Sequence, residues 1–237
     1  MLEFLIISVA IFVGFFVQSI AGFASMLMAM PFLLMVLDLK EALALGAVFL
    51  ALFSLILIPK NWRHIDKKIF GEVGLAIVFG FIIGFQVLKY GNPLILKKVL
   101  GVFILSYVVY SALKKGRIKY FEKKGVLFGL VGGFFTGLFS SGGPFIVTYI
   151  RNKLDKSAVV RGTVIGVFGI INCVRIPMLI QSKILTWDVF FKALLGIPAF
   201  LLALYLGHLF YNRLNEKAFQ NIILGLLFIS GVLILIK

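Results

Sequence analysis

The sequence predicts an all-α integral membrane protein with two homologous repeats, each formed by a broken or re-entrant helical hairpin and three transmembrane helices. Composition, segment lengths and an internal duplication support this fold class. Of the 237 residues, 62% are hydrophobic and only 14% are charged, and the mean hydropathy is +1.12. A soluble domain could not cover so apolar a core with polar residues, so we expect a multi-pass membrane protein.

Six apolar segments have the length of a membrane-spanning helix, which needs about 20 residues. Each segment is bounded by charged or turn-forming residues. In chain order they cover residues 42–59, 71–88, 94–113, 158–180, 189–211 and 218–236.

Two further apolar stretches, residues 2–37 and 125–150, are interrupted near the middle. The first contains "VQSIAGFAS" at 17–25, and the second contains "GLFSSGGPF" at 137–145. Glycine is a poor helix former, and proline lacks the N–H group that a continuous helix needs. Each stretch is therefore predicted to hold two short helices joined by a break.

The two interrupted stretches lie at matching points of an internal duplication. "GFF" at Gly14 recurs at Gly133, and "LGVFILS" ending at Ser106 recurs as "LGLLFIS" ending at Ser230, so offsets of 119 and 124 relate the halves. The lysine-rich stretch 114–124 is the natural junction. We therefore expect a first repeat at residues 1–115 and a second at 116–237.

The net charge of +15 reflects lysines and arginines in short loops, which favours membrane orientation over nucleic-acid binding. If each interrupted stretch returns to its side of entry, 15 of these residues face one side and 7 the other. If each interrupted stretch crosses the membrane once, the two sides carry 13 and 9 lysines and arginines. We prefer the hairpins, which place both termini outside the cytoplasm, and single crossing is the alternative.

Hairpins entering from opposite faces make an inverted pair of repeats. About 10 residues of helix would carry each tip near the midplane of the bilayer. Irregular backbone is tolerated at that depth where protein buries it or where it lines a cavity, so the breaks predict a central site.

The break at Gly142 and Gly143 is predicted to expose the N-terminus of a helix, with the glycines supplying backbone freedom and Pro144 fitting the first turn. Free N–H groups and the helix dipole favour an anion there. Gly22 offers a comparable helix end in the first half. The alternative, that small residues serve tight helix packing, stays open, above all for Gly14, Gly132 and Gly133.

Arg161, Asn172 and Arg175 fall within about 40 degrees of one helix face. A charge as deep as Arg175 is costly in a membrane, so it is expected either to contact a ligand or to anchor loop carbonyls. Arg161 could instead reach the interface. Cys173 is expected to be a small core residue. The candidate substrate-binding residues are Gln18, Ser19, Gly22, Ser25, Ser140, Ser141, Gly142, Gly143, Asn172 and Arg175.

Three stretches resemble the signatures of the sulfite exporter TauE/SafE family, also described as sulfite or organosulfur permeases. They are "FFVQSIAGFASMLMAMPFL" (15–33), "GLFSSGGPFIVTYI" (137–150) and "RGTVIGVFGIINCVR" (161–175). The resemblance implies a secondary carrier for sulfite, sulfonates or other organosulfur acids in a prokaryotic cytoplasmic membrane. Many members have three consecutive glycines in the second motif, whereas this chain has two serines before Gly142, which leaves the substrate open.

The acidic residues lie in loops or near segment ends, which argues against a proton relay and favours export driven by the membrane potential. No catalytic cluster or metal-ligand spacing is present, so we expect neither an enzyme, a metal nor a cofactor. The expected partners are a small anion and membrane lipid, and a homo-oligomer is compatible with the sequence. An anion channel and a non-transporting structural protein remain the alternatives.

Overall fold

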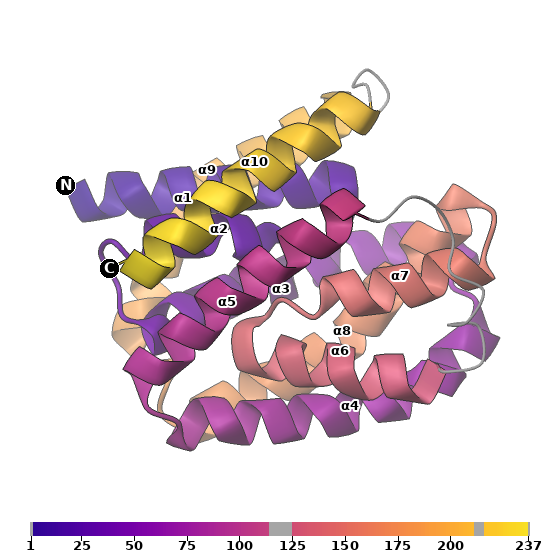
Figure 1. Cartoon of the computed structure of the whole chain (residues 1–237), viewed down its shortest axis with the longest axis horizontal. Coiled ribbons are helices and arrows are strands. Elements are labelled where there is room, and N and C mark those ends of the chain that lie inside the picture. Colours follow the sequence, from indigo (N-terminus) through magenta and orange to yellow (C-terminus); the bar gives the residue numbers. More distant parts are fainter. Residues whose placement is uncertain (1, 114–124, 211–215, 237) are drawn as a thin grey trace. The chain divides into compact units, whose positions relative to one another are not determined.

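The computed structural model describes residues 2–113, 125–210 and 216–236, and every regular element within those ranges is helical. Figure 1 labels the α-helices. The elements are α1 (Leu2–Ala21), α2 (Ser25–Leu33), α3 (Leu39–Asn61), the short 3-10 helix η1 (Trp62–His64), α4 (Lys67–Tyr90), α5 (Pro93–Leu113), α6 (Gly125–Phe139), α7 (Gly143–Lys153), α8 (Ser157–Gln181), α9 (Trp187–Phe210) and α10 (Glu216–Ile236).

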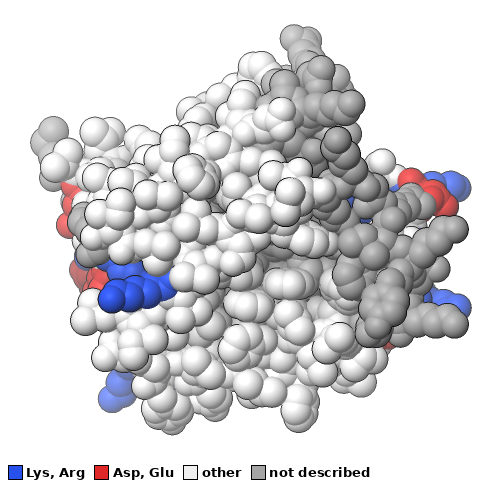
Figure 2. All heavy atoms as spheres, viewed as in Figure 1, with Lys and Arg blue, Asp and Glu red and all other residues white. Residues whose placement is uncertain are grey.

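The six predicted spanning segments form helices α3, α4, α5, α8, α9 and α10 over their described residues. Among the described residues, six helices are long and apolar enough to cross a membrane: α1, α3, α4, α5, α8 and α9. Their outward faces carry large apolar side chains such as Leu75, which is 84% exposed. Uncharged residues form most of the face shown in Figure 2. Such surfaces suit lipid rather than water.

Both interrupted stretches are broken as predicted, between α1 and α2 and between α6 and α7. The helices before the breaks are longer than the roughly 10 residues that would carry a tip to the midplane. Helix α1 has 20 residues and α6 has 15, whereas α2 and α7 have 9 and 11. At 1.5 Å per residue, α1 alone is long enough to span a bilayer.

The chain forms two compact units, and each takes helices from both halves of the sequence. Unit 1 contains α1, α2, the start of α3, α5, α9 and α10; unit 2 contains the rest of α3, η1, α4, α6, α7 and α8. The predicted repeat junction at 114–124 lies outside the described residues, so the division into residues 1–115 and 116–237 stays a prediction.

Glycines bring α4 and α6 of unit 2 into close backbone contact. A Cβ atom at Gly80 or Gly84 would meet the carbonyl oxygen of Leu130 or Phe134. On the facing helix, a Cβ atom at Gly133 would likewise meet a carbonyl oxygen of α4. This is the small-residue packing that membrane helices use when no hydrophobic driving force holds them together. The packing interpretation left open for Gly133 is therefore supported.

Unit 1 is held by α1 against α9 and by α5 against α10. The rings of Phe15 and Phe200 meet edge to face with centroids 5.0 Å apart, and both side chains are fully buried. Gly207 lies against Ser19, where a Cβ atom would clash with the serine side chain. Within this unit, the small residues at one contact and the aromatic pair at the other hold α1 closely against α9.

Side chains cap three of the long helices. Glu41 N–H donates to the Asp38 carboxylate at 2.8 Å before α3, Ile69 N–H donates to Asp66 at 2.9 Å before α4, and Leu94 N–H donates to Asn92 at 2.9 Å before α5. These acceptors satisfy N–H groups that have no partner inside a helix. By contrast, no side chain caps α2 or α7, the two helices that follow the breaks.

Candidate functional site

The break in unit 1 is a short left-handed turn between α1 and α2. Gly22 and Ala24 have φ angles of 82° and 80°, and Gly22 N–H donates to the carbonyl of Gln18 at 2.8 Å. An alanine in this conformation costs roughly 1–2 kcal/mol, so the surrounding structure must hold the turn in place. The turn redirects the chain into α2, which begins at Ser25.

Three of the predicted binding residues beside this break, Gln18, Ser19 and Ser25, are buried. The Ser19 hydroxyl donates to the Phe15 carbonyl at 2.8 Å, one turn back in α1. Neither the Gln18 amide nor the Ser25 hydroxyl makes a hydrogen bond to any described residue. Buried polar groups normally have partners, so these two retain hydrogen-bonding capacity.

In unit 2 the break between α6 and α7 also has one left-handed residue, Ser140, with a φ of 57°. The backbone freedom expected of Gly142 and Gly143 is not used for a left-handed conformation: Gly142 has a φ of −73°, and neither glycine has a positive φ. Glycine is required at 142 for a steric reason. A Cβ atom there would meet the Gly132 carbonyl oxygen and the Thr136 hydroxyl across the break.

The first turn of α7 leaves backbone donors without partners. Pro144 has no N–H group, and the N–H groups of Phe145 and Ile146 donate to the Gly142 carbonyl at 3.2 and 3.4 Å. The N–H groups of Gly142 and Gly143 make no hydrogen bond within the described chain. The predicted fit of Pro144 in this turn is confirmed, and the start of α7 has the donor arrangement that binds anions.

The serines of this break bond mainly to the end of α6. Ser140 N–H donates to the Thr136 carbonyl at 2.9 Å, and Ser141 N–H donates to the Phe135 carbonyl at 3.4 Å. The Ser141 hydroxyl donates to the Phe139 carbonyl at 2.9 Å. These bonds satisfy carbonyls that the end of a helix leaves without partners. Ser141 is therefore committed to the backbone, although its oxygen can still accept.

Arg175 of α8 is 4% exposed and lies against the end of α6. Its Nη2 donates to the Thr136 carbonyl at 2.8 Å, and its Nη1 donates to the Asn172 side-chain oxygen at 3.4 Å. The guanidinium also lies over the Phe81 ring, with its carbon 5.3 Å from the ring centroid. The sequence left open whether Arg175 anchors carbonyls or contacts a ligand, and these bonds have the anchoring geometry.

No carboxylate pairs with Arg175 in the described part of the chain. A guanidinium has five N–H donors, and the bonds to Thr136 and Asn172 use two of them. A buried cation without a counter-ion is costly, and such groups in membrane segments usually serve function. The arrangement thus leaves both charge and donors for an anion.

The other residues of that helix face have different surroundings. Asn172 is buried beside Arg175, as the spacing predicted. Arg161 is half-buried, and the next residue, Gly162, lies against His64. Eleven residues separate Arg161 from Asn172, which is about 16 Å along a helix. The structure places Cys173 at an exposed position, so its predicted place in the core is wrong; it points about 100 degrees away from Asn172.

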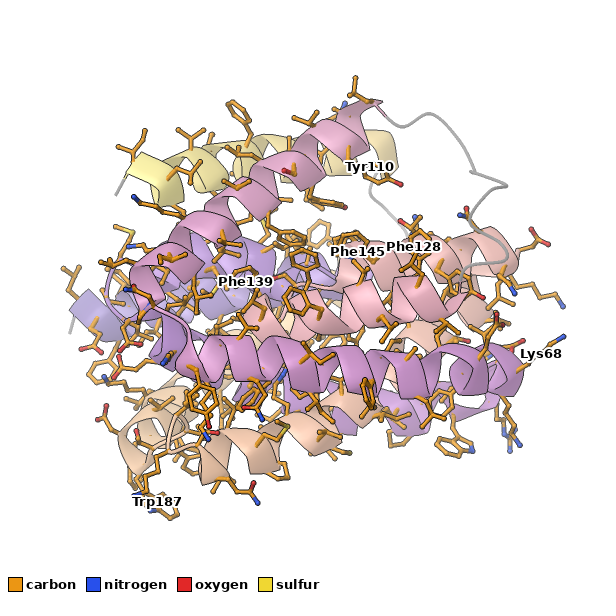
Figure 3. All side chains as sticks on the ribbon, turned by 60° about the horizontal axis from the view of Figure 1, so that its bottom comes forward. Lys68, Tyr110, Phe128, Phe139, Phe145 and Trp187 are labelled. Atoms are coloured by element: carbon orange, nitrogen blue, oxygen red, sulfur yellow. The ribbon has the colours of Figure 1, made fainter. Side chains whose placement is uncertain are left out.

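Aromatic side chains line the same hairpin. The rings of Phe135 and Phe145 stack across the break with centroids 5.4 Å apart and an interplanar angle of 12°. Figure 3 labels Phe145 together with Phe139, the fully buried last residue of α6. These contacts fix the approach of α6 and α7 close to the break.

The far end of the hairpin is tied to α4 by Glu72. The Tyr149 hydroxyl donates to Glu72 Oε1 at 2.7 Å, and Lys153 Nζ lies 3.3 Å from both carboxylate oxygens. A Cβ atom at Gly125, the first residue of α6, would meet the Tyr149 hydroxyl. The start of α6 and the end of α7 therefore lie at the same carboxylate.

Comparison with known proteins agrees with this architecture. The chain matches the family described as "Sulfite exporter TauE/SafE" over residues 6–234. It belongs to the TauE/SafE family.

Two relatives illustrate the family. The protein named "Probable sulfite/organosulfonate exporter TauE" of Cupriavidus necator is 25% identical over 175 residues, covering 72% of this chain and 68% of the relative. A protein of Methanocaldococcus jannaschii named as a probable membrane transporter is 27% identical over 195 residues, covering 75% and 72%. No solved structure was found to match the chain.

Membership of the TauE/SafE family makes this chain a multi-pass membrane transporter rather than an enzyme, and a place in the cytoplasmic membrane fits its candidate spans. The sequence pointed to this family through the motifs around the two breaks. It did not identify Thr136 as the partner of Arg175, Ser54 as the residue that accepts from Asn172 Nδ2 at 2.8 Å, or Glu72 as the residue that ties the α6–α7 hairpin to α4. A polar residue on an apolar helix was the available signal for Ser54 and Thr136, and an acid within the first two turns of a spanning helix was the signal for Glu72.

Proposed function

We propose that this TauE/SafE protein is a secondary transporter that moves sulfite, sulfonates or other small organosulfur anions across the cytoplasmic membrane. The break between α6 and α7 provides the anion site of unit 2. In this proposal the repeats are inverted, the broken segments are re-entrant, and their breaks lie near the midplane of the bilayer. Because α1 has 20 residues, the proposal requires the first part of α1 to lie outside the hydrocarbon core. The name of the Cupriavidus necator relative supports the substrate class.

The observation that carries the proposal is the environment of Arg175. The side chain is buried, and no carboxylate in the described part of the chain balances its charge. A sulfonate or sulfite head group presents several oxygens, which a planar guanidinium binds with two parallel hydrogen bonds. An anion at this point would supply the missing counter-charge.

The start of α7 adds a second source of donors. The N–H groups of Gly142 and Gly143 follow the same break whose carbonyl end Arg175 contacts at Thr136. The positive end of the α7 dipole attracts an anion, as the guanidinium does. The proposal therefore combines one full charge with an uncapped helix N-terminus.

The two ends of the α6–α7 hairpin support a re-entrant segment in unit 2. Gly125 at the start of α6 and Lys153 at the end of α7 both lie at Glu72, near the start of α4. The turn before α4 also meets the start of α8, because Asp66 N–H donates to the Thr163 hydroxyl at 2.9 Å. These contacts favour a segment that leaves the membrane on the side where it entered.

In unit 1 the corresponding candidates are Gln18, Ser19, Gly22 and Ser25. The unpartnered Gln18 amide and Ser25 hydroxyl offer neutral hydrogen-bonding groups, whereas unit 2 offers a charge. We assign both breaks to substrate binding on this basis. The bonds of Ser19 and Ser141 to backbone carbonyls make them weaker donors to an anion than their neighbours.

Flux from proteoliposomes tests this function. Vesicles loaded with sulfite or ethanesulfonate should release it when an inside-negative potential is imposed, because that potential drives an anion outward by about 2.3 kcal/mol per charge per 100 mV. Arg175→Ala should lose the flux. Trans-side substrate should accelerate release through a carrier, whereas a channel would show no such exchange.

The controls separate the remaining alternatives. Absence of flux for every sulfur oxyanion, in protein that is folded by its melting curve, would favour a structural role. Flux that required a pH or sodium gradient and ignored the potential would contradict uncoupled export. Exchange without net flux would establish a carrier but reject an electrogenic one.

A further inference from the structure

The side-chain amide of Asn172 has one orientation that satisfies all its neighbours. Its Nδ2 donates to the Leu50 carbonyl at 3.0 Å and to the Ser54 hydroxyl at 2.8 Å, both on α3. Its Oδ1 accepts from Arg175 Nη1 at 3.4 Å. A flipped amide would place its oxygen against the Leu50 carbonyl and its N–H groups against the guanidinium.

Ser54 completes this arrangement. Its own hydroxyl hydrogen is donated to the Leu50 carbonyl at 3.0 Å, so its oxygen faces Asn172 only as an acceptor. Both amide hydrogens of Asn172 are thereby used on α3. Asn172 keeps no donor for an anion, although the sequence placed it among the substrate-binding residues.

We propose that Asn172, held by Ser54, is a positioning residue that orients the Arg175 guanidinium toward the oxygens of a sulfonate or sulfite head group while leaving its charge uncompensated. This inference rests on the proposed function, because it assumes that Arg175 binds the anion. It assigns Asn172 and Ser54 a part in specificity without contact to the substrate.

The chemical identity of residue 172 matters because of its charge. An amide oxygen accepts a hydrogen bond from Arg175 but carries no net charge. A carboxylate in the same place would form an ion pair with the guanidinium and compete with the substrate for it. It would also bring negative charge to the Leu50 carbonyl that now accepts from Nδ2. In a transporter for anions, asparagine at this position therefore leaves the Arg175 charge available to the substrate, whereas aspartate would neutralise it.

Binding of ethanesulfonate, measured by calorimetry on the full-length protein in detergent, tests this role. Ethanesulfonate stays ionised across the working pH range, so its own titration does not enter. Asn172→Asp should weaken binding at least about tenfold, because the substrate loses a hydrogen bond to the charged guanidinium that aspartate now occupies. The loss should be larger than in Asn172→Ala. Aspartate also loses the donations to Leu50 and Ser54, so the melting temperatures of both variants are measured beside the affinities. A purely structural role predicts that the loss of affinity follows the loss of melting temperature in both variants, whereas the positioning role predicts a larger loss of affinity in Asn172→Asp than its melting temperature accounts for.

Variants at Ser54 provide a second, milder test. Ser54→Ala should weaken binding several-fold, and Ser54→Thr, which keeps the hydroxyl, should restore it. Ser230→Ala removes a buried serine hydroxyl from α10 and should leave the affinity unchanged. Affinity equal to that of the unmodified protein in either Asn172→Ala or Ser54→Ala would overturn the positioning role.

A measurement without any anion separates this inference from the proposed function. The melting temperatures of Ser54→Ala, Arg175→Ala and the double variant should be non-additive, because Ser54 acts on Arg175 through Asn172. Additive effects would overturn the positioning role even if ethanesulfonate binds. Absence of binding by the unmodified protein together with non-additive melting would reject the substrate but keep the positioning role.

Discussion

The guanidinium of Arg175 and the carbonyl of Thr136 join α8 to the end of α6, with Nη2 and the oxygen 2.8 Å apart. Thr136 lies in the last turn of α6, where the helix dipole is negative. The same carbonyl also accepts from Ser140 N–H. One cation from α8 thus stabilises the end of α6, the helix that precedes the break.

Removal of the Arg175 charge should abolish anion-dependent stabilisation. A ligand at 100 times its Kd stabilises the native state by about 2.7 kcal/mol, which a melting curve detects. Against sulfite, sulfate, thiosulfate, sulfoacetate and acetate, we expect one or more sulfur oxyanions to raise the melting temperature. Arg175→Ala should lose this response, and Arg175→Lys should retain part of it because a lysine keeps the charge without the planar fork.

Acetate provides the internal control for that series, since it carries charge but only two oxygens. Equal stabilisation by acetate and the sulfur oxyanions would show that charge alone governs binding. An unchanged response in Arg175→Ala would remove this residue from the binding site and leave it as an anchor for the Thr136 carbonyl.

Gly142→Ala should destabilise the α6–α7 hairpin. The new Cβ atom would meet the Gly132 carbonyl oxygen and the Thr136 hydroxyl, so the two helices must separate. Overpacking of this kind typically costs about 1–3 kcal/mol. Thermal melting in detergent checks it, with Gly74→Ala in α4 as the matched control, because a Cβ atom there meets nothing within 4 Å. Equal melting temperatures for the two variants would refute the close approach.

The long helices and the two breaks were predictable from local sequence. About 20 apolar residues in a row define a span whatever its neighbours are, and the Ser-Gly-Gly-Pro run ending at Pro144 interrupts such a row. The conformation of the break was less predictable. Ser140 rather than a glycine adopts the left-handed φ, and Gly142 is needed for its missing side chain.

The partners of the site residues could not be predicted, because periodicity says which residues share a face but not which helices become neighbours. Arg175 and Thr136 are 39 residues apart, and Asn172 and Leu50 are 122 apart. The spacing of Asn172 and Arg175 on one helix was local information, and their contact is confirmed. The pairing of Glu72 with Tyr149, 77 residues away, carried no such signal.

The link between Glu72 and Tyr149 should contribute measurably to the stability of unit 2. Hydrogen bonds to charged groups contribute about 1.5–3 kcal/mol, and partial exposure of the carboxylate, whose side chain is 32% exposed, lowers the expected coupling to about 1 kcal/mol. A double-mutant cycle of Glu72→Gln and Tyr149→Phe, followed by melting, measures it. Asp188→Asn, which removes an ion pair whose carboxylate is 69% exposed, should change stability by less than about 0.5 kcal/mol. A coupling no larger than this control effect would mean that Glu72 does not tie the hairpin to α4.

Cysteine labelling from one side of the membrane should distinguish a re-entrant α6–α7 segment from a single crossing. With Cys173 replaced by serine, new cysteines at Arg63 and Asp155, both exposed, should react with a membrane-impermeant maleimide from the same side. We expect this because the turn before α4 and the start of α8 lie together in unit 2. Gly162 contacts His64, and Asp66 N–H donates to the Thr163 hydroxyl.

A cysteine at Gln181 provides the opposite-side control, because α8 runs for 25 residues between Ser157 and that position, about 37 Å at 1.5 Å per residue. It should react only from the other side. If the Arg63 and Asp155 positions reacted from opposite sides, α6 and α7 together would cross the membrane. The α7 N-terminus would then lie within a through-going broken helix, and the 15-to-7 distribution of basic residues that favoured hairpins would no longer describe the topology.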